Sequence, residues 1–148
     1  MEQATVCLLG EAHLAAVAEL EALCFSEPWS CEALRLLTNP ENFGVVVLIG
    51  ERVVAYGGVT SVLDEGSVTN IATHPDFRRR GFGHAVLEAL LAEADRRGLA
   101  EIFLEVRVSN VAACRLYEKH GFLAVGTRRS FYRFPTEDAV VMKWEKHV

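Results

Sequence analysis

The sequence predicts an α/β fold built on a mixed β-sheet. Strand-like segments at 68–73 and 100–106 are separated by one long amphipathic helix, an order typical of two parallel strands joined by a right-handed crossover. Apolar runs at 43–49 and 53–61 flank a short glycine-containing turn and predict an antiparallel hairpin. Parallel and antiparallel pairing are therefore expected in one sheet.

The other elements of the N-terminal half are a strand and two helices. A short strand is expected at 5–9, followed by a helix at 11–24. Ser30 is the expected N-cap of a second helix, which ends before Pro40, and a turn at 64–66 follows the hairpin. The apolar residues at helical spacing in the first helix are Leu14, Val17, Leu20 and Leu23.

The C-terminal half continues with the crossover helix, which ends near Gly98 after two arginines. A further helix at 111–120 is closed by Gly121, and strands at 122–127 and 139–144 complete the fold. The stripe expected to be buried on the crossover helix consists of Val86, Leu87, Leu90, Leu91 and Ala94.

Length and composition favour one globular domain spanning residues 1–148, of which 51% are hydrophobic. The net charge of −5 argues against nucleic acid as a partner. No apolar run approaches the ~20 residues of a membrane-spanning helix, and the first residues lack the features of a signal peptide. The four cysteines are scattered without metal-ligand spacing, so we expect reduced thiols, no metal site and a cytoplasmic protein.

The segment that leads into the crossover helix has the pattern of a phosphate-binding turn. Three arginines at 78–80 precede Gly81 and Gly83. The unpaired N–H groups and partial positive charge of a helix start bind phosphate, and glycines let the phosphate approach the backbone. No Lys-Ser or Lys-Thr follows, as a P-loop requires, and Val86 occupies the place of the third glycine of a dinucleotide-binding fold. The turn therefore predicts a different phosphorylated cofactor.

Glu105 is a candidate general base. Alternation places it on the face of its strand opposite Ile102 and Leu104, near the C-terminal end of the strand, where α/β sheets bind ligands. A carboxylate in an apolar strand is costly unless it is hydrated or paired. Glu105 therefore either accepts a proton during catalysis, directly or through water, or is a structural carboxylate, in a salt bridge with Arg107 or satisfied at the strand edge.

Asn110, Cys114 and Tyr117 lie on one side of the helix at 111–120, because spacings of four and seven residues return to the same side. Asn110 is either a helix cap or a ligand-binding amide, and Tyr117 is either a core aromatic or a proton donor. Since this helix begins shortly after Glu105, a carboxylate, an amide and a phenol are expected to converge beside the phosphate-binding turn.

Two motifs resemble the GNAT family of N-acetyltransferases. Arg-x-x-Gly-x-Gly at 78–83 is similar to the acetyl-CoA loop of that family. Leu-Glu-Val-Arg-x-Ser-Asn at 104–110, followed by Leu-Tyr-Glu-x-x-Gly-Phe at 116–122, most resembles the RimI-type ribosomal-protein-alanine N-acetyltransferases. The resemblance implies a mixed, mostly antiparallel sheet with a central parallel strand pair, flanked by helices. Other segments that fit the subgroup are Pro28-Trp29-Ser30, Asn70-Ile71-Ala72 and Arg128-Arg129.

The resemblance also implies roles for individual residues. Glu105 would accept the amine proton and Tyr117 would protonate the sulfur of CoA. Acetyl-CoA is the implied cosubstrate, with no metal. The residues implied to bind it are Ile71, Ala72, Thr73, Arg79, Arg80, Gly81, Phe82, Gly83, His84 and Asn110.

The implied acceptor is the N-terminus of a protein or peptide, such as the N-terminal alanine of a small-subunit ribosomal protein. The sequence departs from the subgroup at Thr73-His74-Pro75, and again at Ser130-Phe131-Tyr132, where the acceptor is expected to bind. Two alternatives therefore stay open: acetylation of a small-molecule amine or a lysine, and a CoA-binding module without catalysis.

Overall fold

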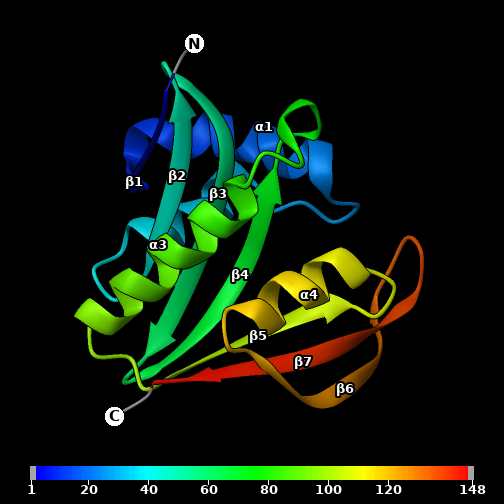
Figure 1. Cartoon of the computed structure of the whole chain (residues 1–148). Helices are drawn as coiled ribbons and strands as arrows, with labels where there is room; N and C mark the ends of the chain where they lie inside the picture. Colours follow the sequence, from blue (N-terminus) through cyan, green and yellow to red (C-terminus); the bar gives the residue numbers. More distant parts are fainter. Residues whose placement is uncertain (1–2, 147–148) are drawn as a thin grey trace.

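A seven-stranded sheet forms the centre of the protein (Figure 1), whose computed structural model describes residues 3–146. The strands follow the order β1-β2-β3-β4-β5-β7-β6, and β4–β5 is the one parallel pair within the described residues. The predicted α/β fold, with a mostly antiparallel sheet and a central parallel pair, is confirmed. The strands are β1 (Ala4–Leu8), β2 (Phe43–Ile49), β3 (Arg52–Val62), β4 (Glu65–Thr73), β5 (Glu101–Arg107), β6 (Leu123–Tyr132) and β7 (Glu137–Glu145).

Helices cover both faces of this sheet (Figure 1). In β2, Val45 and Val47 belong to the cluster on one face and Val46 to the cluster on the other, as alternation along a strand requires. One face carries α1 (Leu14–Cys24) and α2 (Cys31–Leu34), and the other carries α3 (Phe82–Arg96) and α4 (Val111–Lys119). Three 3₁₀ turns lie at Glu11–His13, Arg35–Thr38 and Pro75–Phe77. Across residues 3–146, no helix is long and apolar enough to cross a membrane.

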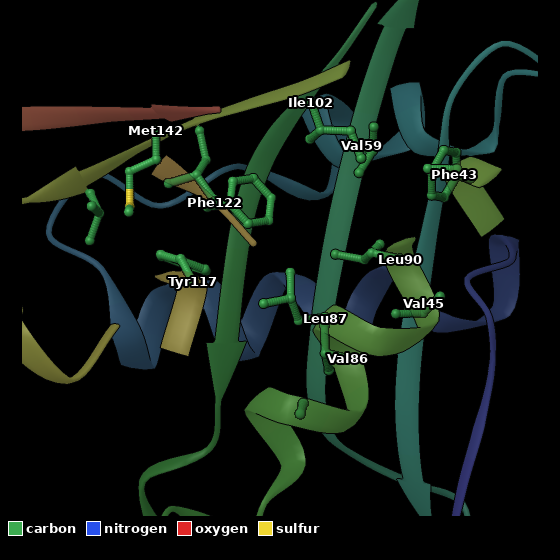
Figure 2. Close-up of a cluster of buried hydrophobic side chains, with 14 of the residues drawn as sticks. Phe43, Val45, Val59, Val86, Leu87, Leu90, Ile102, Tyr117, Phe122 and Met142 are labelled. Carbon is green, nitrogen blue, oxygen red and sulfur yellow. The ribbon is translucent and has the colours of Figure 1, made fainter. Parts of the chain in front are cut away.

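The larger core cluster joins α3 and α4 to the sheet (Figure 2). Val86, Leu87 and Leu90 of α3 are each at most 1% exposed and pack in this cluster. Tyr117 of α4 and the fully buried Phe122 belong to the same cluster. Burying each aliphatic side chain contributes roughly 1.5–3 kcal/mol, so this packing holds both helices against the strands that line the site.

Several boundaries differ from the expectations drawn from the sequence. Leu23 is 58% exposed because three-residue steps drift around a helix of 3.6 residues per turn, and Glu21 occupies the buried stripe instead. Phe122 is a core residue rather than the start of a strand, and β6 runs on to Tyr132. The second helix is one α-helical turn followed by a 3₁₀ turn, and β4 already begins at Glu65.

The parallel pair β4–β5 is short. Glu65–Ser67 pairs with Glu101–Phe103, and the register ends there. Beyond this point β4 stays paired with β3 and β5 stays paired with β7. The two strands therefore diverge in the middle of the sheet, and Figure 1 shows β4 and β5 running apart towards their C-terminal ends.

A β-bulge marks the stretch of β4 that follows the divergence. Val68 pairs with Val59 and Ile71 with Gly57, so two residues of β4, at 69 and 70, lie opposite the single residue Gly58. A Cβ atom at Gly58 would come within 2.6 Å of Thr69 Oγ1, so glycine is what allows this close packing.

Candidate active site

A cavity of about 410 Å³ lies where β4 and β5 diverge. Strands β4 and β5, the start of α4 and the loops after α1 and β6 form its walls. Among the described residues, Ala72 and Thr73 lie outside the lining; Ala72 is buried on the α1 side, and the carbonyl oxygen of Thr73 accepts a hydrogen bond from Arg78 Nε at 3.2 Å. The cavity brings together four of the residues expected from the sequence: Ile71, Glu105, Asn110 and Tyr117.

Glu105 projects into the cavity from β5, where its neighbour Leu104 is buried on the opposite face. Its side chain is 26% exposed, and Oε1 lies 3.7 Å from Arg128 Nε of β6. The alternative pairing with Arg107 is wrong, because Arg107 Nη1 binds Glu137 Oε1 at 3.1 Å. Glu105 thus keeps enough contact with solvent to exchange a proton with water.

Tyr117 faces the cavity from α4 and is 8% exposed. Burial raises the pKa of its phenol well above the ordinary value, so the hydroxyl stays protonated at neutral pH. Asn110, at the start of α4, accepts a hydrogen bond through Oδ1 from the backbone N–H of Ala113 at 3.1 Å. Asn110 is therefore the helix cap, and its Nδ2 remains available as a donor in the cavity wall.

Two loops from distant parts of the sequence meet at one side of the cavity. Glu27, after α1, binds Arg133 Nη2 at 2.9 Å, and Ser26 Oγ donates to the carbonyl oxygen of Arg133 at 3.1 Å. Arg107 anchors the second loop by donating to the carbonyl oxygens of Arg133 and Pro135 at 3.1 and 2.9 Å. These contacts hold together two loops that line the cavity, as do Glu105 and Tyr132.

Glu21 of α1 is fully buried and accepts hydrogen bonds from three separate elements. The backbone N–H of Trp29 donates at 2.9 Å, Asn70 Nδ2 donates to both carboxylate oxygens at 3.1 and 3.0 Å, and the hydroxyl of Tyr56 donates to Oε2. Burial and the neighbouring carboxylate raise the pKa of Tyr56 far above its usual value, so its hydroxyl is a donor. The side chain of Trp29 is partly buried against the core cluster on the α1 face of the sheet.

The start of α3 fits the phosphate groups of a cofactor. Arg79 and Gly81 have positive φ angles of 65° and 82°, and a Cβ atom on Gly81 would meet no atom within 4 Å. The helix bond from Ala85 N–H to the carbonyl oxygen of Gly81 leaves the preceding N–H groups without helical partners. Because the first turn carries no acidic residue and follows three arginines, this open backbone is suited to an anion.

The first turn of α3 packs against α4. A Cβ atom on Gly83 would lie 3.3 Å from Leu116 Cδ2, and His84 Nδ1 lies 3.0 Å from His120 Nε2. The turn for which the sequence predicts phosphate binding is therefore next to the helix that carries Tyr117.

Glu21 and Asn70 are polar residues of this region whose connection the sequence did not reveal. Glu21 follows Leu14 by seven residues and Val17 by four, so a carboxylate on the buried stripe of α1 was the available signal. In the sequence, Asn70 stands out only as part of the Asn70-Ile71-Ala72 motif. The bulge that turns it towards α1 depends on the pairing of β3 with β4.

The model of the acetyltransferase (GNAT) family matches residues 14–122, which is most of the chain. The chain belongs to this family. It is an acetyl-CoA-dependent N-acetyltransferase, as the two sequence motifs predicted.

Relatives of known name agree with this assignment. The ribosomal protein bS18-alanine N-acetyltransferase of Salmonella typhimurium is 37% identical over 93% of this chain and 95% of its own length. The N-alpha-acetyltransferase RimI of Mycobacterium tuberculosis is 37% identical over 96% of this chain and 92% of its own length. The crystal structure of the ribosomal-protein-S18-alanine N-acetyltransferase from Escherichia coli superposes with a TM-score of 0.92 at 33% identity, covering 99% of this chain and 96% of that one.

Proposed function

We propose that this acetyltransferase modifies the α-amino group of a protein N-terminus, with the N-terminal alanine of ribosomal protein bS18 as the acceptor. The observation that carries the proposal is the cavity between β4 and β5, in which Glu105 and Tyr117 share one space beside the phosphate-binding start of α3. The names of the relatives that cover nearly the whole chain supply the identity of the acceptor.

Acetyl-CoA supplies an activated acetyl thioester in this reaction. Arg79, Arg80 and the backbone N–H groups at 81–84 would hold its pyrophosphate, because they combine positive charge with unpaired donors. The backbone of Ile71 and the Nδ2 of Asn110, which both line the cavity, would bind the pantetheine arm, with the adjoining β4 backbone at 72–73 outside the lining.

Glu105 would accept the proton of the attacking amine, directly or through water, and Tyr117 would donate a proton to the departing thiolate. The raised pKa of Tyr117 keeps the phenol protonated at neutral pH, so a proton is present to donate, and the same shift makes the phenol a weaker acid towards the thiolate. An α-amino group, with a reference pKa near ~7.8, is already about a tenth neutral at pH 7, whereas a lysine needs roughly 3.5 kcal/mol more for deprotonation. One carboxylate aided by water can therefore deprotonate an α-amino group more easily than a lysine side chain.

Mass spectrometry of acetyl transfer onto a panel of acceptors tests this function. The panel contains a peptide with the N-terminus of bS18, the same peptide with a blocked N-terminus and an internal lysine, and small primary amines. We expect rapid acetylation of the free N-terminus alone. Preferential modification of lysine or of a small amine would overturn the acceptor assignment, and no transfer to any amine would overturn catalysis in this cavity.

A further inference from the structure

The buried carboxylate of Glu21 makes no contribution to the mechanism described above, yet it contacts the cavity wall. Its partner Asn70 lines the cavity, and the loop that begins after Cys24 and contains Trp29 contributes Phe25, Ser26 and Glu27 to the same wall. All three groups that donate to Glu21 are neutral. A buried carboxylate held by neutral donors is costly in free energy, and its bonds hold the Asn70 side chain and the backbone of Trp29 in place.

The bonds fix the orientation of the Asn70 amide. A carboxylate can only accept hydrogen bonds, so the NH2 group of Asn70 must face Glu21, at 3.0 and 3.1 Å from its oxygens. The polar atom of the amide that remains for a ligand in the cavity is Oδ1, an acceptor. The β-bulge at 69–70 and the buried donor Tyr56 support this arrangement from the sheet side.

We propose that Asn70 binds the acceptor amine through Oδ1 and that Glu21 is the positioning residue that fixes this orientation. The inference rests on the proposed function, in which the amine enters this cavity. A neutral primary amine carries two N–H donors and one lone pair. If Glu105 receives one N–H and Asn70 the other, the lone pair is left free to attack, so Asn70 contributes to acceptor binding and alignment.

Steady-state kinetics with acetyl-CoA and a short peptide with an N-terminal alanine test the pair. Asn70→Ala removes the acceptor atom and should lower kcat/KM for the peptide about 10- to 100-fold, while the KM for acetyl-CoA stays within about two-fold. Glu21→Gln offers an NH2 group to Asn70 and allows its amide to turn over, which would place a donor in the cavity. Glu21→Gln should therefore also lower kcat/KM for the peptide while the KM for acetyl-CoA stays within about two-fold.

A double variant that exchanges the hydrogen-bond donor and acceptor between positions 21 and 70 distinguishes a positioning role of Glu21 from a role in folding alone. In the double variant Glu21→Gln with Asn70→Asp, the new amide donates to a carboxylate at position 70, which again presents an oxygen to the cavity. This variant should recover at least about 10-fold in kcat/KM over Glu21→Gln alone. No recovery, or single variants with wild-type kinetics and only a lower melting temperature, would overturn the inference.

Two measurements keep the result interpretable. Tyr56→Phe removes a bond to Glu21 without touching the cavity and should lower kcat/KM by less than Glu21→Gln; a larger loss would contradict the proposed path through Asn70. An inactive wild-type protein would show that the proposed function itself is wrong, whereas active wild type with unaffected Asn70→Ala would overturn only this inference.

Discussion

Two buried carboxylates on helices, Glu21 of α1 and Glu93 of α3, are held in opposite ways. Glu93, 9% exposed, is paired with the last residue of its own helix and with the C-cap, with Oε1 at 3.0 Å from Arg96 Nε and Oε2 at 2.7 Å from Arg97 Nε. Glu21 receives only neutral donors among the bonds described above, and they come from three other parts of the chain.

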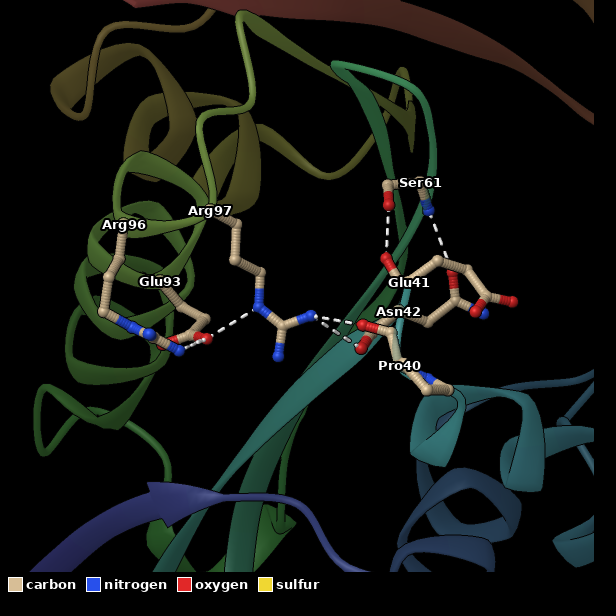
Figure 3. Close-up of polar contacts among 7 residues, drawn as sticks. All are labelled: Pro40, Glu41, Asn42, Ser61, Glu93, Arg96 and Arg97. Atoms are coloured by element: carbon tan, nitrogen blue, oxygen red, sulfur yellow. Dashed lines mark hydrogen bonds and ion pairs between the residues drawn. The ribbon is translucent and has the colours of Figure 1, made fainter.

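Arg97, one of the two arginines that bind Glu93, links the end of α3 to the segment before β2 (Figure 3). Arg97 Nη1 donates to the carbonyl oxygens of Pro40 and Asn42 at 3.0 and 3.1 Å, and Asn42 Oδ1 accepts from the N–H of Ser61 at 3.0 Å. Among the described residues, none of these lines the cavity. The carboxylate of Glu93, paired with cations, connects the end of α3 to the chain next to the β2–β3 hairpin, whereas the carboxylate of Glu21, bonded to neutral donors, orients groups at the cavity. Changes near Glu93 should alter stability, and changes on the cavity side should alter kinetics.

Glu105→Gln tests the cavity side with the largest expected effect. Loss of the base should lower kcat by about 10²–10⁴-fold at pH 7, because the amine must then lose its proton without a positioned acceptor. Cofactor affinity and melting temperature should stay near wild type, and the loss should shrink as pH rises. Turnover close to wild type at neutral pH would remove Glu105 from the mechanism.

Tyr117→Phe comes next and separates catalysis from packing at one side chain. The ring stays in the core, so the melting temperature should change little, while kcat falls at least about 10²-fold if thiolate protonation matters. A purely structural tyrosine would show the reverse, with about 1 kcal/mol lost from the unfolding free energy and full turnover. Measuring both quantities on one preparation decides between them.

Glu93→Gln tests the stability side. It weakens the bonds to both arginines and should lower the unfolding free energy by about 1–2 kcal/mol, measured by chemical denaturation at pH 7. Since Glu93 and its partners lie outside the cavity lining, kcat and both KM values should match wild type. A loss of activity at unchanged stability would break the comparison between the two carboxylates.

The smallest expected effect is a change with pH in the difference in unfolding free energy between wild type and Glu93→Gln. Hydrogen bonds and charges from Arg96 and Arg97 lower the pKa of Glu93 below its ordinary 4.5. Well above pH 4.5 the carboxylate is ionised in both the folded and the unfolded state, and its contribution to stability is complete. As pH falls below 4.5, the unfolded chain takes up the proton first, so the advantage over Glu93→Gln should fade. Melting curves of both proteins from pH 7 to pH 3 check this, and a constant difference would contradict it.

Periodicity and local motifs predicted most of the fold. Alternation in β5 placed Glu105 opposite the buried Leu104, and the glycines at 81 and 83 marked the start of α3. These features depend on residues a few positions apart, which is why the sequence carries them. Phe122 was misplaced because a single apolar residue beside a helix-ending glycine fits a strand and a core position equally well.

The polar network around Glu21 could not be predicted in the same way. Its donors, at 29, 56 and 70, are far apart in the sequence, and Asn70 faces α1 only because β4 bulges against β3. The cavity depends on where β4 and β5 stop pairing, which no local pattern encodes. Arg107 likewise pairs with Glu137 rather than with Glu105, which is nearer in the sequence. The pairing of β5 with β7 brings Glu137 close to Arg107.

Because the β4–β5 pairing covers three residue pairs, the strand hydrogen bonding divides the sheet into two units, β1–β4 and β5–β7, joined at a short seam. Past Ser67, the backbone amides of β4 that face away from β3 have no strand across from them, so their deuterium uptake should be fast relative to those bonded to β3. A cosubstrate bound in the seam would link both units and slow that uptake. The free energy of local opening at the seam would then rise with the concentration of acetyl-CoA, by mass action.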